Sequence, residues 1–387
     1  MGTSEKEIIG LVLLLSAGCV YLMAASGCRQ YPPPQEGLRT APLIRGTLWW
    51  IPPEKTKDQW QKEYLAGEIQ AQIDVGFDLL WIFNTPNFVQ EAIKTQAEGK
   101  SHDMLEVVYE IADKKGMHVI VDLPKASWHG ETTPENMIAE NKKHIQLFFD
   151  RYGHHPSFYG WYLNYEINPI RPSEKDLSAF WRKAWKGIVS ECHRVAPGSV
   201  VTISPFFLLD KDSLRGFTYL EPELYEQWWG VTPAETKIDI LMLQDSGEHL
   251  RFFTLEEREP FFAAFARACQ RAGTRFWLNV ETGQEDVGTW DEYFENQKRR
   301  KEMWDYWQFT PMEQLEGKLH LAARYGANII NWGYYPFMSP HSLTDEELDG
   351  QQAAYDAYKA YYERTINRDE VPVLAPLRAR TPPGDGH

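Results

Sequence analysis

Residues 158–167 (FYGWYLNYEI) and residues 276–281 (FWLNVE) are the stretches that decide the fold expected for this chain. Both are short runs of aromatic and β-branched residues, a composition typical of buried parallel strands. Each run carries a glutamate at or near its end, Glu166 in the first and Glu281 in the second. Six further runs have the same character: residues 43–51, 78–84, 118–124, 200–208, 238–245 and 328–337. In chain order the two glutamates therefore belong to the fourth and seventh of eight predicted strands.

Amphipathic stretches of helical length separate these runs. The clearest are residues 57–75, 102–115, 134–152, 174–195, 255–272 and 312–325. A glycine follows four of these patterns, and we expect Gly76, Gly116, Gly273 and Gly326 to form left-handed C-caps. Strands that alternate with helices in this way predict an α/β fold, a single (β/α)₈ TIM barrel over residues 43–366.

The two ends of the chain have a different composition from the barrel. Residues 1–28 contain an apolar stretch that ends in Ala25-Ser-Gly-Cys28, a pattern typical of a secretory signal peptide. The cysteine after small residues resembles the lipobox of bacterial lipoproteins, which implies lipidation of Cys28 and a membrane-anchored protein on the outside of a bacterial cell envelope. Cys19 also fits this pattern, and an uncleaved membrane anchor is the alternative. We interpret residues 29–42 as a proline-rich tether and residues 367–387 as a C-terminal tail.

Composition limits the partners. The formal net charge of −15 argues against nucleic acid as a partner and disfavours polyanionic substrates. Cys192 and Cys269 fall late in helices that are not neighbours in the barrel, so we expect free thiols. The histidines include the pair His154-His155 but form no HExxH motif, and we predict neither a metal site nor a cofactor. The oligomeric state is not determined by these patterns.

Side chains alternate along a strand, so Tyr162, Asn164 and Glu166 are expected on one face and Asn279 and Glu281 on another single face. TIM barrels carry their chemistry at the carboxyl ends of the strands, where both glutamates would converge. Two carboxylates about 5 Å apart are the requirement for retaining glycoside hydrolysis. We expect Glu166 to be the acid/base and Glu281 the nucleophile, while the asparagines and Tyr162 contact the sugar.

Further candidates lie near the predicted mouth. Asp245 ends the sixth run and could orient a substrate hydroxyl or act as an alternative catalyst. Trp290 belongs to an aromatic insertion, residues 286–310, which is either a substrate-flanking lid or a helical hairpin packed on the barrel. We expect Asp122 to be structural, because the proline that follows in its run indicates a tight turn. Trp49 and Trp50 cannot both face the mouth, so one of them is expected in the core.

These positions resemble those of the clan A retaining glycoside hydrolases. The resemblance implies an acid/base at the end of strand four, a nucleophile at the end of strand seven, and an aromatic floor on strand eight, here Trp332 with Tyr334 beside it. The segments FYGWYL, IDILMLQD and WLNVE are also similar to a bacterial family of barrel domains of unknown function.

One feature departs from the clan A pattern, which has asparagine directly before the acid. Here Tyr165 separates Asn164 from Glu166. A barrel that binds glycans without cleaving them, and an amidase that uses Glu281 with Asp245, remain as alternatives.

Overall fold

The computed structural model describes residues 42–51, 60–99, 103–125, 130–167, 170–246, 249–302, 305–340 and 351–366. All of them belong to one compact unit, Thr40–His387. The predicted signal peptide, Cys28, nearly all of the tether and the C-terminal tail lie outside the described residues.

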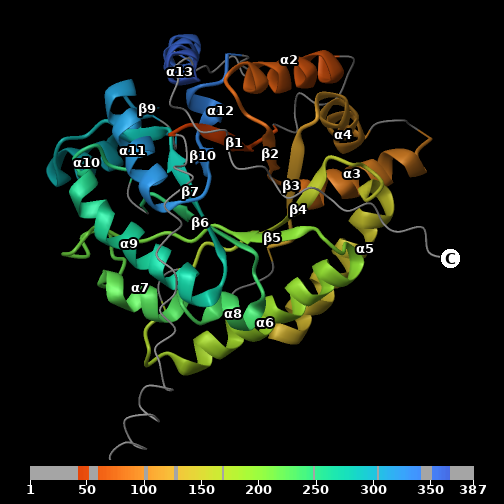
Figure 1. Ribbon diagram of the computed structural model, residues 1–387, viewed down its shortest axis with the longest axis horizontal. Coiled ribbons are helices and arrows are strands. Elements are labelled where there is room, and N and C mark those ends of the chain that lie inside the picture. The colour runs from red at the N-terminus through yellow and green to blue at the C-terminus, as the bar shows by residue number, and fades with distance from the viewer. Residues whose placement is uncertain are drawn as a thin grey trace, which may run out of the picture. The chain divides into compact units, whose positions relative to one another are not determined.

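Eight parallel strands close into a barrel, which confirms the predicted fold (Figure 1). They are β1 (Ile44–Trp49), β2 (Leu79–Ile82), β3 (His118–Asp122), β4 (Phe158–Leu163), β5 (Val200–Ile203), β6 (Ile240–Gln244), β7 (Arg275–Glu281) and β10 (Ile329–Trp332). The order around the barrel is β1-β10-β7-β6-β5-β4-β3-β2. Each of the eight apolar runs therefore contains one barrel strand, and strands that are successive among these eight lie side by side.

Helices surround this ring of strands (Figure 1). They are α2 (Trp60–Asp74), α3 (Thr85–Ala97), α4 (Met104–Lys115), α5 (Pro134–Tyr152), α6 (Lys175–Val195), α7 (Pro222–Trp229), α8 (Thr232–Thr236), α9 (Leu255–Ala272), α10 (Trp290–Arg299), α11 (Met312–Tyr325), α12 (Tyr334–Phe337) and α13 (Gln351–Ile366). The six predicted helices are confirmed as α2, α4, α5, α6, α9 and α11. Within the part of the chain that the structure covers, no helix is both long enough and apolar enough to span a bilayer.

The glycines after the helices serve two different purposes. Gly76, Gly116 and Gly273 have φ angles of 86°, 69° and 70°, so their predicted left-handed conformation is confirmed. The prediction is wrong for Gly326, which is extended, with φ −100° and ψ 151°. A Cβ atom there would come within 2.2 Å of the Leu278 side chain, so close packing accounts for this glycine.

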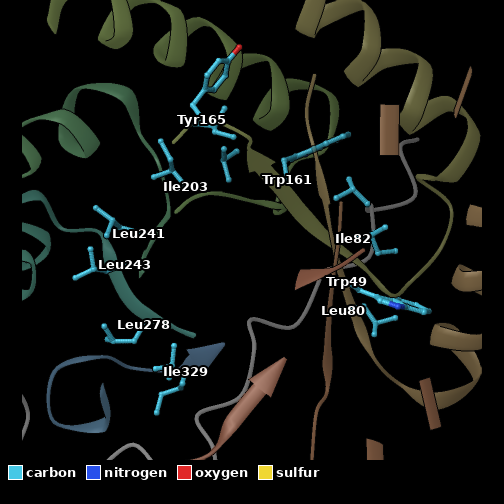
Figure 2. Packing of buried hydrophobic residues seen from close by; sticks show 14 of the residues in the cluster. Trp49, Leu80, Ile82, Trp161, Tyr165, Ile203, Leu241, Leu243, Leu278 and Ile329 are labelled. Carbon is cyan, nitrogen blue, oxygen red and sulfur yellow. The ribbon is translucent and has the colours of Figure 1, made fainter. Parts of the chain in front are cut away.

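Two apolar layers hold the barrel together. Side chains that point outward from the strands pack against the helices, and Figure 2 labels several of them, among them Leu80, Ile82 and Trp161. Side chains that point inward fill the lumen, including Leu79 and Trp81 from the same strand β2. The near-continuous apolar runs follow from this burial of both faces. Cys192 and Cys269 are buried free thiols in the outer layer, as predicted.

The aromatic insertion contains the helix α10 and, after it, the short strand β9 (Trp307–Phe309). The strand β9 pairs antiparallel with β8 (Gly283–Glu285), which lies directly before the insertion, and the two form a ribbon with α10 between them in the chain. The ribbon begins two residues after Glu281, at the carboxyl end of β7. It therefore places insertion residues at the mouth of the barrel.

Candidate active site

Glu281 ends β7 on the inner face of the barrel. Trp277 lies below it in the lumen, whereas Leu278 and Val280 point outward, so the predicted alternation holds along this strand. The Glu281 side chain is 3% exposed, and its Oε2 atom contacts Nδ1 of His249 in a short hydrogen bond. Burial raises the pKa of Glu281, the imidazole of His249 opposes this rise, and the charge of Asp245 adds to it. The site thus holds a desolvated carboxyl group beside a proton donor.

A buried ion pair supports Glu281 from behind. The ammonium group of Lys318, on α11, donates to the backbone carbonyl of Glu281 at 2.6 Å and lies 2.7 Å from Oδ2 of Asp245. Asp245 is 1% exposed. Its carboxylate therefore forms a buried ion pair with Lys318. This contact gives Asp245 a structural interaction and does not support the substrate-orienting or catalytic role that was considered for it.

Glu166 lies three residues beyond the end of β4 and is exposed. Its Oε1 atom accepts a hydrogen bond of 3.1 Å from Nε2 of Gln244. Gln244 ends β6, where it lies opposite Asn279 on β7. Both glutamates are therefore at the carboxyl ends of the barrel strands, one exposed and one buried, and Gln244 contacts the exposed one.

The extra residue between Asn164 and Glu166 has a structural explanation. The side chain of Tyr165 is fully buried in the outer layer, where its ring packs edge-on against Trp181 of α6 at 5.1 Å. Its neighbours point the other way: Asn164 donates to Asp122 at 3.2 Å, and Glu166 accepts from Gln244. Tyr165 thus anchors the segment to the helical layer and leaves Asn164 and Glu166 at the mouth.

Asp122 is a cap for the segment after β2, as expected of a structural residue. Its carboxylate accepts from the backbone N–H groups of Asn84 at 3.1 Å and Thr85 at 2.8 Å, at the start of α3. Burial raises the pKa of Asp122 to about 6, although these hydrogen bonds lower it in part. Since Asn164 donates to the same carboxylate, its interaction in this structure is with the protein scaffold.

Two of the predicted sugar contacts lie in the lumen below the mouth. Tyr162 is 3% exposed and packs edge-on against Trp81, with ring centroids 4.6 Å apart. Asn279 is 2% exposed and donates to Ser204 Oγ at 3.1 Å. Both side chains therefore lie below the glutamates, where they contact other residues of the barrel lumen.

Trp332 lies next to the buried glutamate. It is paired with Glu281 in the β10–β7 register, and its half-buried ring lies 5.6 Å from the imidazole of His249. The ring of Trp307, from β9, packs beside both of these rings: its centroid lies 4.8 Å from that of His249 and 5.7 Å from that of Trp332. Gly333 follows with φ 101°, a conformation that favours glycine.

Two predicted site residues are not brought to the glutamates. Tyr334 is fully buried, and its hydroxyl donates to Glu68 of α2 at 3.2 Å. Trp290 packs against the aromatic rings of Phe252 and Phe253, at 5.4 and 6.0 Å. Both side chains contribute to packing around the rim of the barrel.

Four residues of the site were not predicted as such: Gln244, His249, Trp307 and Lys318. His249 lies in the loop after β6, and no recognised motif surrounds it. Lys318 lies on α11, and nothing in the amphipathic sequence of that helix marks this lysine as part of a site. Gln244 was detectable, because it precedes Asp245 at the end of a predicted strand. Trp307 is one of several aromatic residues in the insertion, and nothing in the sequence distinguishes it from the others.

One group of possible metal ligands occurs among the described residues, away from these glutamates. Donor atoms of Glu106, His154 and His155 lie within 4.8 Å of one another. The imidazole of His155 already faces two carboxylates, Asp113 at 2.7 Å from Nδ1 and Glu106 at 3.3 Å from Nε2. We therefore assign His155 to ion pairing.

Comparison with solved structures identifies proteins of the same fold. A putative α-L-fucosidase from Bacteroides thetaiotaomicron VPI-5482 superposes with a TM-score of 0.62 at 19% identity, over 87% of this chain and 98% of the other. A β-galactosidase from the psychrophilic Marinomonas ef1 gives a TM-score of 0.50 at 10% identity, over 84% and 60% of the two chains. At these identities the likeness concerns the fold, which is the (β/α)₈ barrel found in glycoside hydrolases.

Comparison with curated proteins finds no match. A family model, by contrast, matches residues 44–344, which include every barrel strand and both glutamates. The chain belongs to the family described as "Domain of unknown function (DUF4434)".

Proposed function

We propose that this protein hydrolyses a glycosidic bond in a neutral oligo- or polysaccharide, with Glu281 as nucleophile and Glu166 as acid/base. The observation that carries the proposal is the pair of glutamates at the ends of β4 and β7, held in unlike environments by Gln244 and His249. Paired carboxyl groups in different environments can divide the acid and nucleophile roles of glycoside hydrolysis. The fold, which is shared with a putative α-L-fucosidase and a β-galactosidase, supports glycoside hydrolysis as the reaction class.

In the proposed reaction the Glu281 carboxylate attacks the anomeric carbon while Glu166 protonates the departing glycosidic oxygen. A glycosyl ester forms on Glu281 as the bond to the leaving alcohol breaks. Water then attacks the same carbon, Glu166 takes its proton, and the ester bond to Glu281 breaks, which restores both groups.

His249 is a positioning residue in this scheme. Because its imidazole contacts Oε2 of Glu281, we assign the attack to Oε1. Burial alone would favour the neutral form of Glu281, and a nucleophile must be ionised. The hydrogen bond from His249 opposes burial and so favours the reactive carboxylate.

The near-complete burial of Glu281 favours a second candidate, a barrel that binds sugars without cleaving them. In this case Glu281 is a structural partner of His249. The exposed Glu166 and the aromatic residues at the mouth then remain as the sugar-binding surface.

The experiment is a screen of the purified protein against a panel of neutral polysaccharides, with detection of new reducing ends. On a substrate that is cleaved, Glu281→Gln is expected to abolish turnover and preserve binding. Glu166→Gln is expected to slow substrates with poor leaving groups most, because they depend on protonation. Glu256→Gln, an exposed glutamate at the start of α9, is the matched control.

Near wild-type rates in both Glu281→Gln and Glu166→Gln would refute the two-glutamate mechanism. Sugar binding to the wild-type protein without any new reducing ends would favour the second candidate.

A further inference from the structure

A stacked aromatic pair, the exposed Trp50 and the half-buried Phe83, stands at the mouth of the barrel after the two strands that follow β10 around the ring. Trp50 follows the last residue of β1, and Phe83 follows the last residue of β2. Trp49 and Ile82 are partners in the β1–β2 register, so Trp50 and Phe83 are the next opposed residues beyond the strands. Their rings are stacked, with centroids 5.2 Å apart and an angle of 13° between the planes.

The two adjacent tryptophans of β1 have opposite environments. Trp49 is fully buried in the outer layer, whereas Trp50 is 41% exposed. Of the two tryptophans, Trp49 is therefore the one that lies in the core. Contact with Phe83 fixes the orientation of the exposed indole of Trp50. A ligand that packs on this indole therefore loses little binding free energy to the ordering of the side chain.

The pair belongs to the same surface as the proposed catalytic site. Phe83 and Trp332 are the two partly buried apolar residues that pack on top of the lumen cluster. The strands β7, β10, β1 and β2 are consecutive around the barrel. Glu281, Trp332, Trp50 and Phe83 therefore follow one another along the rim.

The spacing of the strands gives the scale of this surface. Neighbouring strands lie about 4.8 Å apart, so Trp50 is two strand spacings, roughly 10 Å, along the rim from the strand of Glu281. A sugar ring bound at Trp332 and a second ring stacked at Trp50 would belong to one saccharide chain of more than one unit.

We propose that Trp50 and Phe83 form a remote sugar-binding subsite that receives a pyranose unit of a neutral oligosaccharide whose reactive unit lies at Trp332. This inference rests on the proposed function and adds to it a substrate of at least two sugar units. The apolar C–H face of the sugar ring packs on the exposed indole, and Phe83 holds the indole in place.

The test compares the wild-type protein with Trp50→Ala for the cello-, xylo-, manno- and malto-series of saccharides of increasing length, from monosaccharide to hexasaccharide. Binding is measured by calorimetry in the Glu281→Gln background, and turnover by release of reducing ends in the native background. Trp50→Ala is expected to weaken binding of the oligosaccharides about tenfold and to leave monosaccharides unchanged. Trp50→Phe, which keeps an aromatic face, is expected to restore most of the loss.

Ile366→Ala is the control for loss of an exposed apolar side chain, since Ile366 is 44% exposed at the end of α13. An unchanged dependence on chain length in Trp50→Ala, with wild-type turnover present, would overturn the subsite and leave the proposed function intact. An equal loss for monosaccharides and hexasaccharides would also overturn it, because Trp50 would then act at the reactive unit or in the fold. Failure of the wild-type protein to bind or cleave any oligosaccharide would reject both.

Discussion

Replacing Lys318 with methionine is expected to destabilise the barrel strongly. The Lys318 ammonium group lies 2.7 Å from the carboxylate of Asp245, and the two side chains are 7% and 2% exposed. At this distance and an effective dielectric constant of about 20, the attraction is on the order of 6 kcal/mol. Methionine keeps the length of the side chain but removes the charge, so Asp245 would become a buried, uncompensated carboxylate.

Desolvation of the two groups in the folded state offsets part of this attraction. Breaking one partner of a buried pair typically costs about 3–5 kcal/mol of the free energy of unfolding, and we expect a loss in this range. Lys318→Met also removes the donor to the Glu281 carbonyl, so the carboxyl end of β7 loses a support.

The assay is urea unfolding followed by circular dichroism and tryptophan fluorescence. The double variant Asp245→Asn with Lys318→Met is expected to recover much of the loss, because no buried charge then remains unpaired. Lys298→Met is the matched control, since its partner Glu295 and Lys298 itself are exposed on α10. A loss in Lys318→Met no larger than in this control would refute the argument that the pair is buried and mutually neutralising.

Four other predictions concern the site, the buried Glu68 and the N-terminal cysteine Cys28. His249→Asn should move the acid limb of the pH profile of kcat/KM to higher pH, because it removes the group that lowers the pKa of Glu281; an unmoved limb would contradict the positioning role. Burial raises the pKa of Glu68 from 4.5 to about 7, so its protonation should add roughly 3 kcal/mol to stability below pH 4.5, and this contribution should be lost as pH rises through 7. Unfolding of Glu68→Gln measured across this window should lack that component, and an identical pH dependence in wild type and variant would exclude it. Trp332→Ala should weaken sugar binding about tenfold or more with an unchanged circular dichroism spectrum, whereas an equal loss of folded stability would make Trp332 a core residue. We also propose lipid attachment at Cys28, so Cys28→Ala should abolish labelling by radioactive palmitate in cells, and unchanged labelling would move the anchor to Cys19 or elsewhere.

The helices show which features of the fold can be predicted from local sequence patterns and which cannot. The helices α5, α9 and α11 begin and end at the predicted residues, because each has an amphipathic repeat with a clear start and stop. The short helices α7 and α8 were not predicted, since 8 and 5 residues are too few for a repeat to stand out. Gly326 shows the same limit, because its sequence position matches a C-cap, whereas in the structure it is extended and its lack of a Cβ atom leaves room for Leu278.

The sequence by itself determined the barrel and the presence of Glu166 and Glu281 at its carboxyl end. Parallel strands buried on both faces must be apolar nearly throughout, so their number and order can be read from composition alone. A polar residue at the end of such a run is then assigned to the mouth without knowledge of any contact.

Only the tertiary structure decided what surrounds each glutamate. His249, Lys318 and Trp307 reach Glu281 or its neighbours from a loop, a helix and a ribbon that are 32, 37 and 26 residues away in the chain. No local pattern encodes such contacts, because they depend on how the closed barrel brings distant segments to one edge. The same closure sets Trp50 and Phe83 beside Trp332, and the burial it imposes on Glu281 is the physical reason that the two glutamates differ.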